Sequence, residues 1–223
     1  MKFSCLACDY DGTIAHDGRV APSTVVALKR FAAAGGKLLL VTGREVRDLL
    51  LIFPEIAMFD CVVAENGALL YDPATREEQL LAPPPSEILI NELRRRGIQM
   101  SVGRAIIATW RPNVQDVADA IRETKQDVRV ILNKNAVMIL PSGVDKASGL
   151  RVALSDLRIA PEDVVGVGDA ENDLDFLAIC GAGVAVANAL PEVKSKVAYV
   201  TRGDHGAGVE ELIATLLDGT FQV

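Results

Sequence analysis

The chain has 223 residues, a length that suits one large domain or one domain with a small insert. Its formal net charge of -7 argues against nucleic acid and anionic membranes as partners, because such a surface repels both. Half of the residues are apolar and 4% are aromatic, which predicts an aliphatic core of buried parallel strands flanked by helices.

The first 82 residues alternate between strand and helix patterns. A proline near the start and Gly35-Gly36 at the end delimit one helix, and Asn66-Gly67 between two apolar runs signals a hairpin. The predicted elements are strands over residues 3–8, 37–41 and 61–64 and helices over residues 22–34 and 45–53.

The pattern changes at the stiff, proline-rich segment 82–85. Beyond it the order is helix, strand, strand, twice over, which is typical of a small α+β module. The predicted helices span residues 86–97 and 112–125; two short strands lie within 98–110, and two more span 128–132 and 136–140. We therefore expect an inserted domain over residues 83–142.

The alternation resumes after the insert. Helices are predicted over residues 146–157, 170–180 and 208–217, and strands over 163–167, 184–187 and 197–200. The expected fold class is α/β: a Rossmann-like parallel sheet core, formed by residues 1–82 and 143–223 and interrupted by the α+β insert.

The four cysteines include a C-x-x-C pair, Cys5 and Cys8, which a redox or zinc site would use. Positions i and i+3 of a strand face opposite sides, and there is no second such pair, so all four are expected to be small buried hydrophobes. No uncharged apolar run reaches about 18 residues. These features predict a reduced, cytoplasmic protein.

Two carboxylates follow the first strand. Asp9 and Asp11 are two residues apart, so in an extended chain they share one side. At ~4 Å and an effective dielectric constant of ~20 they repel by roughly 4 kcal/mol. A divalent cation such as Mg²⁺ would turn that cost into a binding site.

Further polar groups follow other predicted strands or open a helix: Thr42-Gly43-Arg44, Lys146, and Asp169 with Asp173. Each has an ordinary explanation, since Thr42 and Asp169 suit helix N-caps and Lys146 suits a solvated helix surface. Together they mark several strand ends of one sheet, which is where ligands bind in doubly wound folds.

These residues resemble the motifs of the haloacid dehalogenase superfamily of phosphotransferases. The matching segments are Asp9-Tyr10-Asp11-Gly12-Thr13, Val41-Thr42-Gly43-Arg44, Lys146, and Gly168-Asp169-Ala170-Glu171-Asn172-Asp173. The insert is similar to the class II, subclass B cap of the Cof-type branch, which Glu65-Asn66-Gly67-Ala68 and residues 183–189 also resemble. The resemblance covers nearly the whole chain.

The resemblance implies a mechanism. Asp9 attacks phosphorus and forms an aspartyl-phosphate, and Asp11 protonates the leaving oxygen and then takes a proton from water. Mg²⁺ is held by the Asp9 carboxylate, the Asp11 main-chain carbonyl and Asp169, with Asp173 completing the shell directly or through water.

The same resemblance assigns the phosphate contacts. The Thr42 hydroxyl, the Gly43 amide and the Lys146 ammonium hold phosphate oxygens. Arg44 and Asn172, from the second and fourth motifs, are expected to contact the substrate as well.

Other readings use part of this pattern. A receiver-like phospho-acceptor also has acids, a hydroxyl and a lysine at strand ends, but it needs no insert. A phosphomutase of the same superfamily would hand the phosphoryl group to a sugar, and the motifs do not exclude it. A dinucleotide site is disfavoured because Glu171 stands where the third glycine of G-x-G-x-x-G belongs.

The substrate is expected to be a small phosphate monoester. Chain length and the compact cap are similar to those of archaeal-type phosphoglycolate phosphatases, while other Cof-type relatives act on sugar phosphates or nucleotide-derived phosphates. Within the cap, Arg104, Trp110 and the loop 133–135 are candidates to face the opening of the core, although an ordinary surface or packing role is the better explanation of each. The sequence does not indicate an oligomeric state.

Overall fold

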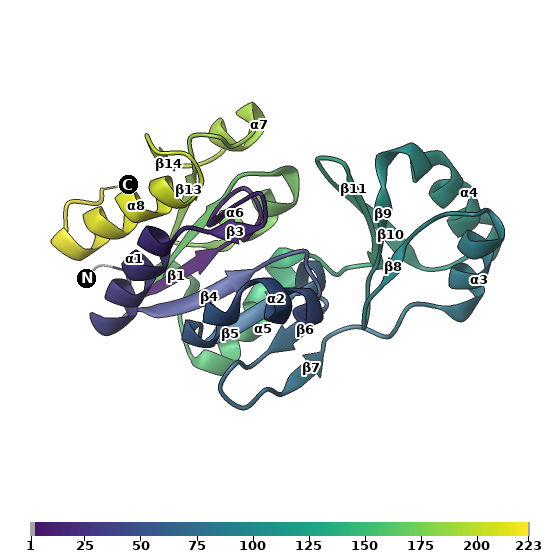
Figure 1. Ribbon diagram of the computed structural model, residues 1–223, viewed down its shortest axis with the longest axis horizontal. Helices are drawn as coiled ribbons and strands as arrows, with labels where there is room; N and C mark the ends of the chain where they lie inside the picture. Colours follow the sequence, from purple (N-terminus) through teal and green to yellow (C-terminus); the bar gives the residue numbers. More distant parts are fainter. Residues whose placement is uncertain (1–2, 223) are drawn as a thin grey trace.

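Residues 3–222 are described by the computed structural model, and they form two bodies, each built on its own sheet (Figure 1). The larger body, the core, has an eight-stranded sheet. From one edge to the other its strands are β14 (Tyr199–Val200), β13 (Ala182–Ala185), β12 (Val164–Gly168), β1 (Cys5–Cys8), β4 (Lys37–Val41), β5 (Cys61–Ala64), β6 (Leu69–Tyr71) and β7 (Glu78–Leu80). The strands from β14 to β5 pair in parallel, and β6 and β7 continue antiparallel.

Helices cover both faces of this sheet, so its central strands are apolar throughout rather than alternating. All four residues of β1 and all five of β12 are buried. Helix α1 packs against α8, and α5 packs against α6. The core helices are α1 (Pro22–Ala33), α2 (Val46–Ile52), α5 (Lys146–Leu157), α6 (Leu174–Ile179), α7 (Pro191–Lys194) and α8 (His205–Asp218).

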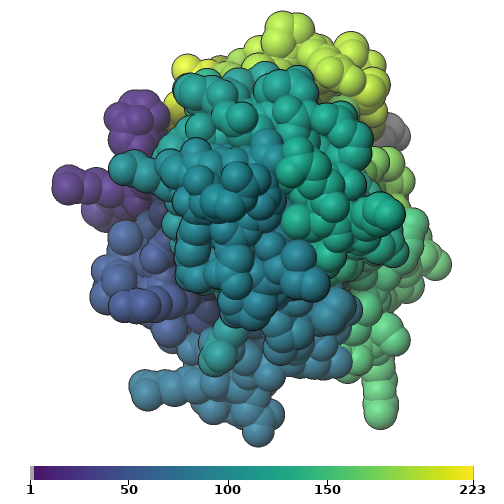
Figure 2. Space-filling view, turned by 90° about the vertical axis from the view of Figure 1, so that its right-hand side faces the viewer, coloured from purple at the N-terminus to yellow at the C-terminus, as the bar shows by residue number. Residues whose placement is uncertain are grey.

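The smaller body has a four-stranded antiparallel sheet in the order β10 (Val128–Asn133), β11 (Ala136–Pro141), β9 (Ile107–Trp110) and β8 (Ser101–Val102). Two helices, α3 (Glu87–Arg95) and α4 (Val114–Thr124), bury Leu93 and Val117 against this sheet on the side away from the core (Figure 1). We call residues 83–142 the cap; these boundaries stay a prediction. Seen from the cap side, the cap lies in front of the core (Figure 2).

The predicted α/β class with a parallel sheet is confirmed, and several elements match to the residue, among them β4, β5 and α5. The predicted helix over 170–180 is instead a short 3₁₀ turn, Glu171–Asp173, followed by α6. The hairpin of β2 (Ala15–His16) and β3 (Arg19–Val20), as well as β7 and α7, were not predicted. Across residues 3–222, every helix is too short or too polar to cross a lipid bilayer.

Candidate active site

The order of the strands brings three loops of the core together. Strands β12, β1 and β4 are neighbours, and their carboxyl ends carry Asp169, Asp9 and Thr42. The ladder continues past β1, because the Asp9 amide donates to the Val167 carbonyl at 3.0 Å. Residues 160 positions apart in the chain therefore meet at one edge of the sheet, as ligand sites in doubly wound folds do.

Asp9, Asp169 and Asp173 form a buried acidic triad. Each offers a carboxylate oxygen within 4.8 Å of the others, and the three are 4%, 0% and 0% exposed. Asp173 lies close to Asp169 because its Oδ2 accepts from the amides of Asp169 and Ala170, at 2.8 and 2.9 Å. This local hydrogen bonding replaces the predicted first helical turn.

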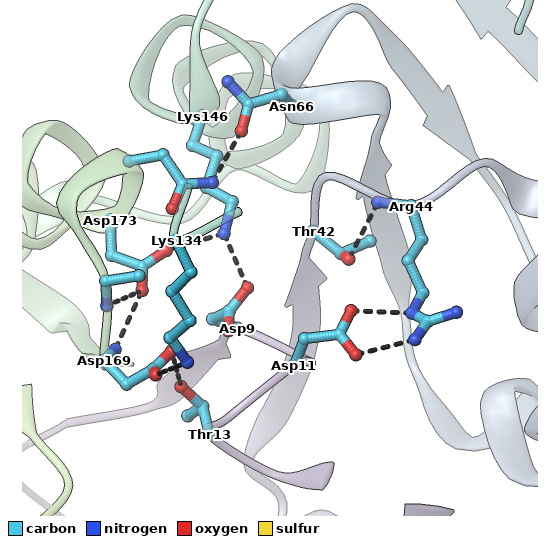
Figure 3. A network of polar contacts seen from close by, with 12 residues as sticks. Asp9, Asp11, Thr13, Thr42, Arg44, Asn66, Lys134, Lys146, Asp169 and Asp173 are labelled. Carbon is cyan, nitrogen blue, oxygen red and sulfur yellow. Dashed lines mark hydrogen bonds and ion pairs between the residues drawn. The ribbon is translucent and has the colours of Figure 1, made fainter. Parts of the chain in front are cut away.

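Lys146 reaches the triad from the first turn of α5. A capping box fixes the start of this helix, since the Asp145 carboxylate accepts from the Ser148 amide at 2.8 Å. The ammonium of Lys146 is fully buried and donates to Oδ1 of Asp9 at 2.5 Å and to Oδ1 of Asp173 at 2.6 Å (Figure 3). Burial alone would lower the pKa of Lys146, but the charges of Asp173 and Asp9 outweigh it and raise that pKa.

The triad has more negative charge than its lysines neutralise. Burial, and then the charge of Asp173, raise the pKa of both Asp9 and Asp169 above the ordinary aspartate value. Buried, anionic oxygen donors at this spacing suit Mg²⁺. Gly12, at φ 87°, leaves the approach open: a Cβ there would lie 2.4 Å from Oδ2 of Asp169. The residues present thus fit the expected metal.

A second lysine comes from the cap. Lys134 sits in the tight β10–β11 turn at φ 50°, and its ammonium donates to Oδ2 of Asp169 at 2.6 Å. The Arg111 guanidinium bonds the Lys134 carbonyl and so supports this turn. The sequence placed the loop 133–135 only among the candidates facing the core; nothing in its pattern singled out Lys134.

Asp11 does not join the triad. Its carboxylate turns toward Arg44, which binds it in a bidentate pair with distances of 2.6 Å from Nε and 2.7 Å from Nη2 (Figure 3). Asp9 and Asp11 therefore point different ways, because the extended conformation that would have kept them on one side ends with β1 at Cys8 and the chain turns from Tyr10 onward. Arg44, predicted to contact substrate, has Asp11 as its partner here.

The remaining predicted residues lie around this centre. The Thr42 hydroxyl is buried and accepts from the Arg44 amide at 3.1 Å. Gly43 lines the main cavity. Asn172 donates to Oδ1 of Asn66 at 2.9 Å and lines a separate cavity of about 370 Å³.

The main cavity has a volume of about 650 Å³ and lies between core and cap. Asp9, Asp11, Gly43 and Arg44 line it from the core, and Lys134 is among the residues lining it from the cap. Within residues 3–222, Arg44 and Lys134 are the two cationic side chains of its wall. Such a space admits a small anion over the buried carboxylate of Asp9.

Comparisons with known proteins agree on one family. The family model described as haloacid dehalogenase-like hydrolase matches residues 6–102 and 98–213. A phosphoglycolate phosphatase of Methanothermobacter thermautotrophicus is 34% identical over 93% of this chain and 96% of its own length. Phosphoglycolate phosphatase 2 of Saccharolobus solfataricus is 29% identical over 97% of this chain and 93% of its own.

A solved structure shares the fold. The haloacid dehalogenase-like hydrolase from Bacteroides thetaiotaomicron superposes with a TM-score of 0.84, covering 96% of this chain and 99% of its own at 20% identity. At that identity the likeness concerns the fold alone, and it includes both the core and the inserted cap.

Proposed function

The chain belongs to the haloacid dehalogenase-like hydrolases, and from that premise we propose that it hydrolyses a small phosphate monoester through an aspartyl-phosphate on Asp9. That it is a phosphatase follows from its family and relatives. The finer proposal depends on one observation: a buried carboxylate, Asp9, lies at the floor of the main cavity 2.5 Å from the buried Lys146 ammonium.

The residues divide the reaction between them. Asp9 attacks phosphorus in line with the leaving oxygen, and Lys146 offsets the repulsion between carboxylate and phosphate. The Thr42 hydroxyl, the Gly43 amide and Lys146 hold the phosphoryl oxygens. For Asp11 to act as acid and then base, its carboxylate must leave the Arg44 guanidinium, which frees Arg44 to contact the substrate.

Mg²⁺ is the proposed cofactor, held by the carboxylates of Asp9 and Asp169 and the main-chain carbonyl of Asp11, with Asp173 completing the shell. When bound, the metal would neutralise the charge that the phosphoryl oxygens and Asp9 bring together. Support comes from the geometry: three buried carboxylates lie within 4.8 Å of one another, and the ammonium groups of Lys146 and Lys134 neutralise only two of their three charges.

We propose phosphoglycolate as the substrate, on two grounds. Several relatives along the full chain are phosphoglycolate phosphatases. In addition, Lys134 offers the cavity a cap-borne ammonium that a second anionic group can bind. The carboxylate of phosphoglycolate is separated from the ester oxygen by one methylene group, so a single lysine beside the phosphoryl site can reach it.

Phosphate release from phosphoglycolate with Mg²⁺ tests the reaction. We expect continuous turnover that EDTA stops. Asp9→Asn should lower kcat by at least about 10³-fold, because removing a nucleophile costs that much or more, while Asp17→Asn, an exposed control, should not. A protein labelled once by an acyl phosphate without turnover would be a phospho-acceptor instead, and Asp9→Asn retaining activity would remove Asp9 from its role.

The substrate is tested by comparing phosphoglycolate with 2-hydroxyethyl phosphate, in which a hydroxymethyl group replaces the carboxylate. Lys134→Met should lower the ratio of the two kcat/KM values by about 10- to 100-fold, the usual worth of a hydrogen bond between charged groups. Lys134→Arg should restore part of the ratio. A ratio unchanged in Lys134→Met would show that this lysine does not read the carboxylate.

A further inference from the structure

Glu65 is a buried carboxylate at the junction between core and cap. It follows β5 and is 1% exposed, and within residues 3–222 no cationic side chain pairs with it. Its Oε1 accepts from the Arg104 amide at 2.9 Å, and its Oε2 accepts from the Ala105 and Ile106 amides at 2.7 and 3.0 Å. A buried charge without a counter-ion requires hydrogen-bond donors, and these three amides of the cap backbone supply them.

Buried apolar side chains from the core and the cap surround this contact. Ala68 and Ala82 of the chain's first core segment pack with Ala105, Ile106 and Met138 of the cap in one buried apolar cluster. Hydrogen bonds in such an environment are stronger than those in water.

The cap loop is shaped for the carboxylate. A side chain at Gly103 would place its Cβ 2.9 Å from Oε1 of Glu65 and 2.8 Å from Cγ2 of Ile106. Glycine therefore permits the close approach of three successive amides to one carboxylate. The anion lies in a concavity of backbone donors of the kind that binds anions elsewhere in proteins.

Glu65 also begins an unusual turn. Glu65, Asn66 and Gly67 have φ values of 49°, 54° and 103°, and such left-handed backbone is unfavourable for Glu65, whereas Asn and Gly adopt it more readily. The turn is held from the core side, because the amides of Glu65 and Asn66 donate to the carbonyls of Arg44 and Thr42 at 3.0 and 2.9 Å.

The other two residues of the turn touch the catalytic loops. Asn66 accepts from Asn172, next to Asp173 of the triad. Gly67 lies against the start of α5: a Cβ there would be 1.8 Å from the carbonyl oxygen of Asp145 and 3.1 Å from the backbone nitrogen of Lys146. One three-residue turn thus contacts the cap, the loop after β4, the loop after β12 and the helix that carries Lys146.

We propose that Glu65 is a positioning residue that sets the cap over the active site. Its carboxylate fixes the loop 103–106 against a turn whose backbone is locked to the catalytic loops. The height and angle of the cap sheet, and with them the place of Lys134 above Asp169, follow from that contact. The kinetic part of this inference rests on the proposed function; the structural part does not.

Hydrogen exchange of single amides, followed by NMR, tests the anchor directly. Glu65→Ala should speed exchange of the Arg104, Ala105 and Ile106 amides by roughly tenfold or more, since each loses a charge-assisted bond. Glu65→Gln should be selective. The single side-chain oxygen of the new glutamine can accept from the amides of Ala105 and Ile106, whereas its NH2 group cannot accept from the amide of Arg104. Among the three backbone amides, that of Arg104 should therefore exchange fastest.

Glu78→Gln is the matched control. Glu78, in β7, pairs with the side chain of Arg104 at 3.0 Å. This ion pair involves the same cap loop as Glu65 but lies at the surface. Its loss should leave the three amides at wild-type rates. Wild-type exchange in Glu65→Ala would overturn the proposal, as would equal acceleration in Glu78→Gln. If Glu65→Ala fails to fold, the pattern in Glu65→Gln decides.

The kinetic readout is substrate preference. With the cap displaced, kcat/KM for phosphoglycolate should fall about tenfold or more relative to that for 2-hydroxyethyl phosphate in Glu65→Gln. Faster exchange with an unchanged preference would reduce Glu65 to a structural residue and overturn its positioning role. Absence of turnover by the wild-type protein on any phosphate ester would reject the proposed function, and the exchange result would still decide whether Glu65 anchors the cap.

Discussion

The Lys134 ammonium lies 2.6 Å from Oδ2 of Asp169, so a side chain of the cap places its charge on a carboxylate of the core triad. The Asp169 side chain is fully buried, whereas that of Lys134 is 48% exposed. The lysine is therefore the solvent-accessible partner of the pair. A divalent cation bound at the triad would repel this ammonium, so the two cations would compete for one site.

Lys134→Met should strengthen Mg²⁺ binding to the substrate-free protein, because it removes that competitor. The pair is partly solvated, so the expected gain in affinity is modest, about 2- to 5-fold. Isothermal titration calorimetry measures it. Lys125→Met is the control, since Lys125 is an exposed cap lysine that also has a positive φ but lies outside the cavity. Unchanged affinity in Lys134→Met would contradict the competition.

Asp11→Asn and Asp169→Asn should separate catalysis from metal binding. The Asp11 carboxylate pairs with Arg44 and is not one of the three that cluster. Asp11→Asn should therefore lower kcat by about 10²- to 10⁴-fold, the usual worth of a general acid or base, while keeping Mg²⁺ affinity within a few-fold. Asp169→Asn should lose measurable binding. Calorimetry and phosphate release on both variants check this, and weak Mg²⁺ binding by Asp11→Asn would be the contrary result.

The metal-free protein should become less stable as pH rises from about 4 toward neutrality. Burial raises the pKa of Asp9 and Asp169 above the unfolded value of 3.8, so the folded state binds protons that the unfolded chain has released. The free energy of unfolding then decreases with pH across that window. Urea unfolding in EDTA at several pH values measures the slope.

The decrease of the free energy of unfolding with pH should be smaller in Asp169→Asn, because this change removes one of the two carboxyl groups with a raised pKa and part of the repulsion on the other, Asp9. Saturating Mg²⁺ should also flatten the slope, because the metal stabilises the ionised carboxylates. A metal-free slope of the same size in the variant and the wild-type protein would show that these groups do not carry the effect.

The thiols should be inert in the native protein. Burial raises the pKa of Cys61 and of Cys180 to about 12, and it raises those of Cys5 and Cys8 as well. Since only the thiolate reacts, native protein at pH 8.5 should take up almost no iodoacetamide, whereas denatured protein should take up four equivalents. Mass spectrometry counts the adducts. Rapid native labelling at Cys5 or Cys8 would reopen a redox role for the C-x-x-C pair.

Much of the fold could be predicted from the sequence because the patterns that indicate its strands and turns lie within a few consecutive residues. Fully buried parallel strands such as Lys37–Val41 read as unbroken aliphatic runs, and the β5–β6 hairpin was marked by Asn66-Gly67. The elements that were not predicted are short, such as the two-residue strands of the β2–β3 hairpin. They are held by hydrogen bonds to neighbours rather than by any periodicity of their own.

The candidate site divides in the same way. That Asp9, Thr42 and Asp169 lie together could be predicted, because each directly follows a recognisable strand and parallel strands end at one edge of the sheet; their roles stay a prediction. The direction of the Asp11 carboxylate could not be predicted, because it depends on Arg44, 33 residues away, as a bidentate partner.

The sequence by itself determined the alternation of elements, the acids and hydroxyl at successive strand ends, the lysine opening α5, and the family. Only the tertiary structure decided that Lys134 meets Asp169 and that Glu65 binds the amides of 104–106. The reason is physical. Strand and helix signals arise between residues a few positions apart, whereas these contacts join separate bodies across 35 and about 40 positions, and no local preference of the chain encodes where two packed bodies touch.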